Sequence, residues 1–472
     1  MKYKIDFIFD YVFPTFILPN ATMPEVGVIN YLSSMHSTKA QNATLFEQQI
    51  SLGELFDNEL GGMPNSATGY FYQAQVYKSL IQSEEKALYL NIPSYRDFIY
   101  PIKPNAILNQ FAGYNTGQGN RMNGEFFWKY ISKKAMEYIK DRRATIYLDY
   151  SMEPWIDRET YVALHECLKL SDIPSKSVFI CVNSFNAQQC YENWFPEEER
   201  QFKVRNLPFC YDHSSWYYSD ALEKNIPICM NEQNFLSTHS TIRRNHFLMK
   251  IRNGRSQRLA FLYKMATDDL LKYGDWSFLL NSPYNETAAV GTLDHYDFTD
   301  VNLETVKQLH DTAPHFLQNE QTISQYSVNA WTDVDFKSYS DSYFEICFET
   351  FIHGEHKSFT EKVFKPLVNY SPFILVAYPG ALKLLRELGF KTFSPYIDES
   401  YDEIEDANLR LKKIYVEIKR LCSMSKEELH NWYWGMKDIL IHNHNHLINH
   451  HKNGLFGETV IKEFSDTVNK LI

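Results

Sequence analysis

The sequence lacks the features that mark membrane, secreted and zinc-containing proteins. No segment approaches the roughly 20 consecutive apolar residues that a membrane-spanning helix requires. The apolar N-terminal stretch, residues 1–18, carries Asp6 and Asp10 and has no cleavage site, so we expect a first strand there and not a leader peptide. The seven cysteines are odd in number, scattered and without C-x-x-C spacing, which indicates reduced thiols and no structural zinc. These absences predict a cytoplasmic protein without a transmembrane segment, and association with the surface of a membrane stays open.

The chain also lacks an excess of positive charge. It carries 47 Lys and Arg against 58 Asp and Glu, a formal net charge of −11, so no global basic surface attracts nucleic acid or acidic lipid. No nucleic-acid partner is expected, and any charge that binds phosphate must be local. Internal repeats and low-complexity segments are absent as well. At 472 residues, 44% of them hydrophobic, the chain is long enough to form two domains of ordinary size.

From residue 144 onward, short apolar runs alternate with segments of helical periodicity. The first set comprises strand, helix, strand, helix and strand at Ala144–Tyr150, Arg158–Leu170, Val178–Val182, Ala187–Trp194 and Phe202–Leu207. A second set runs from His246 to Phe393. Alternation of this kind predicts parallel sheets covered by helices on both faces. The segment Asn225–Thr241, with Pro227 and a polar Ser-Thr-His-Ser-Thr run, is the predicted linker between two α/β domains.

One strand–loop–helix segment carries the strongest functional signal. The run F-E-I-C-F-E-T at 344–350 alternates like a buried strand and ends on Glu349, and T-E-K-V-F-K-P at 360–366 opens a helix with Thr360 as N-cap. Open α/β sheets bind ligands at the carboxyl ends of their strands, where a helix N-terminus favours an anion. Lys362 in the first helical turn is unfavourable for the helix dipole, which suggests that it serves a phosphate. The alternative is an amphipathic helix on which Glu361 and Lys362 are simply solvated.

A second strand leads to a cluster of arginines. The run F-L-M-K-I-R at 247–252 is followed by the turn Asn253-Gly254 and by a helix that is expected to start near Ser256. Arg252, Arg255 and Arg258 thus gather around one helix N-terminus, where guanidinium groups are suited to the bidentate grip of a phosphate. Solvated arginines are the alternative. If the two strands are neighbours, their loops meet in one crevice, where the cations would repel one another unless an anion fills it.

The region from Tyr343 to about Leu421 resembles the donor-binding part of family-10 (α1,3/4-type) fucosyltransferases. These read F-x-L-x-F-E-N-S, then a short loop, then Y-V-T-E-K. The resemblance is closer to a set of viral and bacterial glycosyltransferases of that kind. Its further elements are F-T-E-K-V-F-K-P-L at 359–367, P-F-I-L at 372–375, P-G-A-L at 379–382, L-G-F-K-T-F at 388–393 and D-E-S-Y-D at 398–402. Two departures stand out: Thr350 replaces the Asn of F-E-N, and N-Y-S at 369–371 replaces a glycine-containing step.

The resemblance implies an α/β fold of the GT-B type, with two Rossmann-like domains, an interdomain cleft and C-terminal helices. Residues 1–240 would form the acceptor-side domain and 241–425 the domain that binds the nucleotide-sugar. Residues 426–472 would form C-terminal helices that could cross back to the first domain. The implied activity is transfer of a sugar, fucose being one candidate, from a nucleotide diphosphate-sugar such as a GDP-sugar to a glycan or other hydroxyl acceptor. The oligomeric state stays open.

The implied reaction is inverting and metal-independent, with no cofactor beyond the sugar-nucleotide co-substrate. The predicted donor-binding residues are Arg252, Arg255, Arg258, Glu349, Thr360, Glu361 and Lys362. Among them, Glu349 or Glu361 would accept hydrogen bonds from the ribose or the base. Inversion needs a carboxylate that deprotonates the acceptor hydroxyl. Glu153, in the loop after the strand that ends at Tyr150, is the first candidate, and Asp149 is the second.

Three competing hypotheses remain. Asp333-Val-Asp335 has the D-x-D pattern of metal-dependent transferases, but a metal site is not expected there because no clear apolar strand precedes it. His442, His446 and His450 share one helical face and could hold zinc, yet a polar late helix explains them better because no Cys or Glu partner accompanies them. The third is a non-catalytic protein with a glycosyltransferase-like fold that binds a nucleotide or glycan, of which Thr350 would be a symptom.

Overall fold

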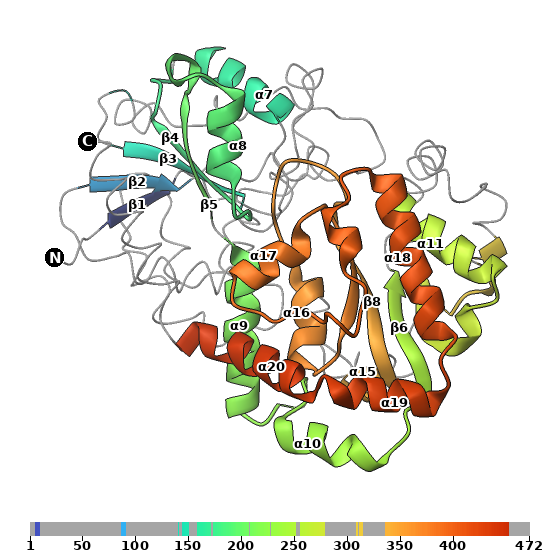
Figure 1. Ribbon diagram of the computed structural model, residues 1–472. Coiled ribbons are helices and arrows are strands. Elements are labelled where there is room, and N and C mark those ends of the chain that lie inside the picture. The colour runs from blue at the N-terminus through green and yellow to red at the C-terminus, as the bar shows by residue number, and fades with distance from the viewer. Residues whose placement is uncertain are drawn as a thin grey trace. The chain divides into compact units, whose positions relative to one another are not determined.

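The protein has a mixed α/β fold built on parallel sheets (Figure 1). The computed structural model describes residues 5–9, 86–90, 140, 144–150, 158–170, 173–206, 208–226, 228–251, 255–278, 308–309, 311–314 and 336–452. The chain divides into two compact units. Unit 1 consists of Met1–His213, His356–Ser358 and Gly454–Ile472, and unit 2 consists of Ser214–Glu355 and Phe359–Asn453.

The sheet of unit 1 is parallel throughout its described strands. These are β1 (Ile5–Phe9), β2 (Lys86–Leu90), β3 (Ala144–Tyr150), β4 (Val178–Val182) and β5 (Phe202–Asn206), which pair in chain order. Helices α7 (Arg158–Leu170) and α8 (Ala187–Trp194) connect the last three strands, and η5 (Glu197–Glu199) precedes β5. Tyr161 and Tyr191, one from each helix, are buried with their rings 4.7 Å apart. The alternation predicted for residues 144–207 is therefore confirmed.

The segment predicted to be a linker is helical and packs on unit 2. It follows α9 (Phe209–Glu223) and contains α10 (Glu232–Ser237) and η6 (Thr238–Ser240). The backbone N–H of Met230 donates to Asn369 Oδ1 at 3.1 Å, and the ring of Phe235 lies 4.3 Å from that of Tyr370. These contacts attach the segment to unit 2, so the division falls at residue 213 and not near residue 240.

The sheet of unit 2 has the strand order β7-β6-β8-β9, and all pairs are parallel. Its strands are β6 (Asn245–Ile251), β7 (Gly274–Phe278), β8 (Ser342–Phe348) and β9 (Phe373–Val376). The chain passes from β6 to β7 on one side and from β8 to β9 on the other, so the order reverses between β6 and β8. Two loops that leave neighbouring strands in opposite directions open the crevice in which α/β sheets bind ligands.

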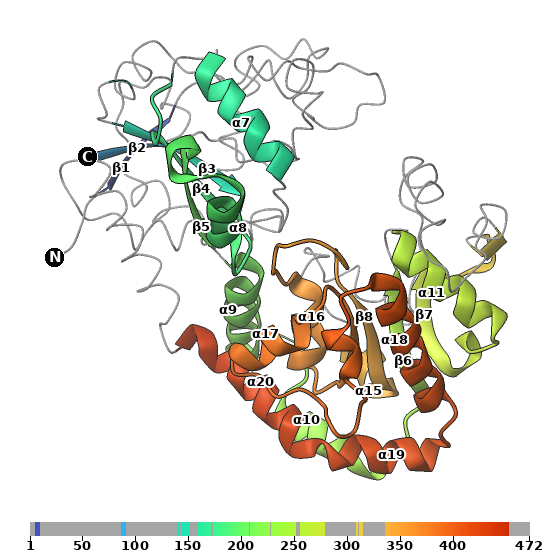
Figure 2. The same ribbon diagram turned by 45° about the horizontal axis from the view of Figure 1, so that its top comes forward.

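Helices surround this sheet, as Figures 1 and 2 show. They are α11 (Ser256–Thr267), α15 (Phe336–Asp341), α16 (Glu361–Val368), α17 (Ala381–Glu387), α18 (Ala407–Cys422), α19 (Lys426–Gly435) and α20 (Lys437–Lys452), with the short helices η7 (Leu271–Tyr273) and η8 (Ser400–Glu403). Both views show α20 alongside α16, on which it packs. The predicted C-terminal helices are thus present in unit 2 as far as Lys452, and the crossing back proposed for the last residues falls outside the described part of the chain.

The two faces of β8 differ in chemistry. Phe344 and Phe348 lie on the apolar face, where Phe348 meets Phe261 of α11 edge-on with ring centres 5.6 Å apart. Glu345 and Cys347 occupy the opposite face and are also buried. A parallel strand covered on both sides is normally apolar on both. Packing of a hydrophobic core therefore does not explain the buried Glu345 on this face of β8.

A tyrosine takes the place of the glycine-containing step between α16 and β9. Tyr370 has a φ of +52°, in the left-handed region that costs a non-glycine residue about 1–2 kcal/mol. Its ring is stacked between Phe235 and His444, at 4.3 and 4.2 Å between ring centres. Stacking on both faces offsets the backbone strain, and this explains how the turn dispenses with glycine.

In the part of the chain that the structure describes, no helix is both long and apolar enough to cross a membrane.

Candidate anion-binding site

The two loops that carry the predicted site residues leave neighbouring strands at the same edge of the sheet. Strands β6 and β8 are paired in register, with Phe247 opposite Phe344 and Leu248 opposite Glu345. The loop before α11 and the loop before α16 therefore start side by side at the switch point, which the sequence led us to expect only if these two strands were neighbours. Arg252 and the Asn253-Gly254 turn lie outside the described residues.

Glu349, the first residue after β8, is held by its own chain. Its Oε1 accepts a hydrogen bond from the backbone N–H of Thr360 at 3.0 Å, and its Oε2 accepts from Thr360 Oγ1 at 2.7 Å and from the Thr350 N–H at 3.1 Å. The side chain is 1% exposed, and burial raises its pKa. These contacts make Glu349 the support that fixes Thr360, whereas the sequence predicted that it could accept hydrogen bonds from a ligand.

Thr360 is the N-cap of α16, as predicted. Its backbone is extended, and its Oγ1 accepts from the backbone N–H of Lys362 at 3.4 Å. The same oxygen also accepts from Lys362 Nζ at 3.2 Å. Because Thr360 is buried and clamped by Glu349, the start of α16 has a defined position at the crevice.

Lys362 and Glu361 form an ion pair at the start of α16. The Nζ of Lys362 lies 3.0 Å from Glu361 Oε1, and the two side chains are 31% and 14% exposed. Burial alone would raise the pKa of Glu361, but Lys362 and Lys365 lower it below its ordinary value. The alternative from the sequence, in which Glu361 and Lys362 are simply solvated, therefore does not describe this ion pair. The side chain of Lys362 is 31% exposed, so part of it faces solvent.

Two arginines at the start of α11 contact the end of β8 and the chain that follows it. Arg258 is buried, and its Nη2 donates to the carbonyl oxygens of Phe348 and Glu349, each at 3.4 Å. Burial and the nearby Arg255 lower its pKa to about 10, so it stays charged at neutral pH. Arg255 is the exposed N-cap residue of α11, with its guanidinium carbon 5.3 Å from the ring centre of Phe351. Both described arginines thus belong to the same site as α16.

The polar face of β8 extends this site into the core, and sequence reasoning missed it. Tyr339 donates its hydroxyl to Glu345 Oε2 at 2.7 Å and accepts from Lys250 Nζ at 3.2 Å. Lys365, one turn after Glu361, is close enough to interact with Glu345 and Glu361, and burial lowers its pKa to about 8. The available signal was Glu345 itself, because a carboxylate in the middle of a buried parallel strand needs a cation.

The charges around the crevice leave an excess of positive charge. The cations are Lys250, Arg255, Arg258, Lys362 and Lys365, and the carboxylates are Glu345, Glu349 and Glu361. Among the described residues just named, five cations stand against three carboxylates, an excess of two positive charges in a protein whose overall charge is −11. Repulsion between the cations is therefore partly relieved by the chain itself. The remaining charge matches a dianion such as a diphosphate.

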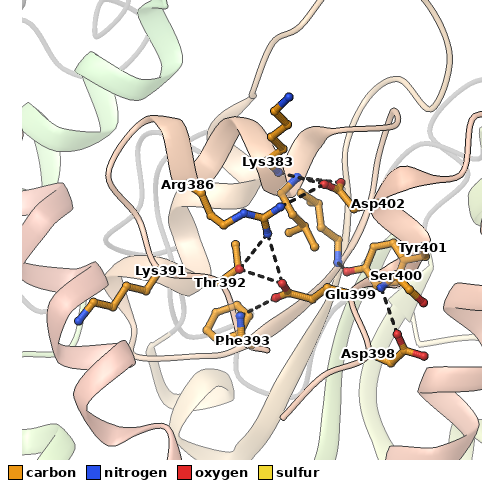
Figure 3. A network of polar contacts seen from close by, with 12 residues as sticks. Lys383, Arg386, Lys391, Thr392, Phe393, Asp398, Glu399, Ser400, Tyr401 and Asp402 are labelled. Atoms are coloured by element: carbon orange, nitrogen blue, oxygen red, sulfur yellow. Dashed lines mark hydrogen bonds and ion pairs between the residues drawn. The ribbon is translucent and has the colours of Figure 1, made fainter. Parts of the chain in front are cut away.

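The N-terminus of the neighbouring helix α17 is already filled. Asp402 accepts hydrogen bonds from the backbone N–H groups of Leu382 and Lys383, each at 2.9 Å, as Figure 3 shows. In the same network Glu399 accepts from Thr392 Oγ1 at 2.8 Å and lies 3.3 Å from Arg386. A carboxylate of the chain thus already occupies this helix start, where the helix dipole favours it.

The remaining predicted residues are placed as follows. Asp149 lies at the carboxyl end of β3 in unit 1, paired with Cys181 of β4. Glu153 and Asp333-Val-Asp335 lie outside the described residues. His442 and His446 contact the carbonyls that end α17, with their Nε2 atoms 3.0 Å from Gly389 O and 2.7 Å from Leu388 O.

These two histidines therefore connect α20 to the residues that follow α17. Within the described ranges, no group of three or more His, Cys, Asp or Glu side chains is arranged to hold a metal ion.

Comparison of the chain with models of known protein families gives no match, and comparison with curated protein sequences gives none either.

Proposed function

We propose that the protein is a glycosyltransferase that transfers a sugar from a nucleotide diphosphate-sugar to a glycan or other hydroxyl acceptor. The observation that carries this proposal is the position of Lys362, Arg255 and Arg258 around one switch-point crevice with an excess of positive charge. Two of the family-10-like motifs, at 344–350 and 359–367, flank this crevice. They support a GT-B arrangement with unit 2 as the donor-binding half, and fucose from a GDP-sugar as the first donor to try.

The proposed roles differ between the residues of the site. Lys362 and Arg255, which are accessible, contact the diphosphate together with Arg252, and the buried Arg258 adds a fixed charge beneath it. When the diphosphate binds, Lys362 exchanges Glu361 for a phosphate oxygen, and Glu361 keeps Lys365 as a neighbouring cation. Glu349 and Thr360 hold the helix start in place.

Fixed cations also suit the chemistry of the proposed reaction. Negative charge builds on the leaving diphosphate as the sugar becomes oxocarbenium-like, and preorganised Lys and Arg groups stabilise that charge without a metal ion. In an inverting reaction a carboxylate on the acceptor side removes the proton of the attacking hydroxyl. Glu153 remains the first candidate for this base, and Asp149, at the end of β3, is the second.

A nucleotide screen tests the proposal. The melting temperature is measured with GDP, UDP, ADP, CMP and GMP, each with and without EDTA, and sugar transfer or donor hydrolysis is then measured with the sugar-nucleotides of any base that binds. We expect one nucleoside diphosphate to raise the melting temperature, its monophosphate to do so less, and EDTA to leave the effect intact. If no nucleotide shifts the melting temperature, the proposal is wrong.

Binding without turnover would instead favour a non-catalytic nucleotide-binding protein. The observation that favours a non-catalytic protein is Thr350, which stands where the fucosyltransferases have Asn.

A further inference from the structure

Arg410 of α18 is a buried arginine that binds the backbone of three separate loops. Its side chain is 1% exposed. Its Nε donates to the carbonyl of Ala377 at 3.1 Å, and its Nη1 donates to those of Ile404 at 2.5 Å and Glu405 at 2.9 Å. Its Nη2 donates to the carbonyl of Ile352. The planar guanidinium has donors in several directions, and this side chain uses them to join segments that are far apart in the sequence.

The loops that Arg410 joins include two at the carboxyl edge of the sheet. Ile352 lies in the loop between β8 and α16, and Ala377 directly follows β9. The third loop, with Ile404 and Glu405, connects η8 to α18. Since β8 and β9 are paired, Arg410 ties the ends of two adjacent strands to the start of α18.

The carbonyl that Arg410 holds belongs to the loop that forms the anion site. Ile352 directly follows Phe351, whose ring lies beside the Arg255 guanidinium. Thr350, one residue earlier, donates its N–H to Glu349, which in turn holds Thr360. Movement of Ile352 would therefore disturb both the Phe351–Arg255 contact and the support of the α16 N-terminus.

We infer that Arg410 is a positioning residue that fixes the loop after β8 in the conformation that binds the diphosphate. At 1% exposure it does not contact the ligand itself. This role rests on the proposed function, because it assumes that the crevice binds a nucleoside diphosphate. Lysine cannot replace it, because one ammonium group cannot reach carbonyls on three loops.

Arg243 provides a matched control at the other edge of the same sheet. It is also buried, at 3% exposure, and its Nη1 donates to the carbonyls of Tyr339 and Ser342 at 2.9 and 2.6 Å. Ser342 is the first residue of β8. Arg243 thus has the same kind of contacts at the amino end of the strand whose carboxyl end Arg410 helps to fix.

The test compares Arg410→Lys with Arg243→Lys in the full chain. Backbone hydrogen exchange is followed in peptides that cover residues 350–355, and affinity is measured for the nucleoside diphosphate, GDP or UDP, that binds the wild type. We expect Arg410→Lys to speed exchange of this loop and to weaken binding about tenfold or more, the effect of losing one hydrogen bond to a charged group. Arg243→Lys should change the affinity less than about twofold, a difference of roughly 0.4 kcal/mol, even where it lowers the melting temperature as much.

The possible outcomes distinguish failure of the Arg410 positioning role from failure of the proposed function. If folded Arg410→Lys changes neither exchange nor affinity, or if Arg243→Lys changes both equally, the positioning role is wrong. Faster exchange with unchanged affinity also refutes it. If the wild type binds no nucleotide, the proposed function fails, whereas the exchange rates still decide whether Arg410 fixes the loop. Arg410→Gln replaces the lysine variant if that variant does not fold.

Discussion

The carboxylate of Glu349 offers a quantitative test of how the start of α16 is held. It accepts three hydrogen bonds, two of them from backbone N–H groups that point at different oxygens. In Glu349→Gln, one of these oxygens becomes an NH₂ group, so in either orientation the N–H of Thr350 or of Thr360 faces a donor. A buried N–H without an acceptor costs about 1–3 kcal/mol, and the remaining bonds lose charge assistance worth about 1 kcal/mol more. The expected loss in free energy of unfolding is therefore about 2–4 kcal/mol.

The assay is urea unfolding at pH 7.5, followed by tryptophan fluorescence, with Glu428→Gln as control. Glu428 also accepts a backbone N–H at a helix start, that of Ser425 at 2.8 Å, but it is exposed, so a glutamine there can turn its oxygen to the N–H while water satisfies its NH₂ group. We expect this control to lose clearly less stability than Glu349→Gln. If Glu349→Gln is as stable as the wild type, or if the two variants lose the same amount, the idea that Glu349 clamps Thr360 is refuted.

Three further predictions concern the packing around α16 and α17. Burial lowers the pKa of His444 to about 4, while the unfolded chain binds that proton below about pH 6.5. This histidine should therefore contribute a loss of on the order of 3 kcal/mol as the pH falls from 6.5 to 4, and urea titrations of His444→Gln should show a slope smaller than that of the wild type by this contribution. An unchanged slope would contradict it. Tyr370→Phe keeps the ring stack and should cost less than about 1 kcal/mol, whereas Tyr370→Leu should cost about 2 kcal/mol; equal losses would argue against the stack. Gly389→Ala should lower the free energy of unfolding by about 2 kcal/mol, because φ is +93° and the new Cβ would lie 2.7 Å from the His446 ring; a stabilised variant would contradict this.

Much of the local structure could be predicted from the sequence, because short-range rules determine it. Strand β4 and helix α8 have the bounds that periodicity predicted, and Thr360 is the N-cap that its position before Glu361 and Lys362 indicated. The convergence of the two cation-bearing loops was predicted only conditionally, since it required β6 and β8 to be neighbours. That pairing depends on topology, which no local pattern reveals.

What the sequence did not reveal lies in contacts between distant residues. Glu349 or Glu361 was expected to accept hydrogen bonds from a ligand; in the structure Glu349 accepts three from Thr360 and Thr350, and only the folded loop shows this. Arg410 was not singled out, because its partners are backbone carbonyls, which leave no trace in side-chain patterns. The predicted linker turned out to be helical because Phe235 finds an aromatic partner in unit 2.

The central claim, that a diphosphate binds at the start of α16, is tested most directly by calorimetric titration of Lys362→Ala with the nucleoside diphosphate that binds the wild type. The control is Lys383→Ala, which removes an exposed lysine from the first turn of α17, a helix start that Asp402 already fills. We expect Lys362→Ala to weaken binding by about 1.5–3 kcal/mol, roughly 10- to 100-fold, and Lys383→Ala to leave the affinity unchanged. Unchanged affinity in a folded Lys362→Ala protein, or an equal loss in both variants, would show that the diphosphate does not bind at this crevice.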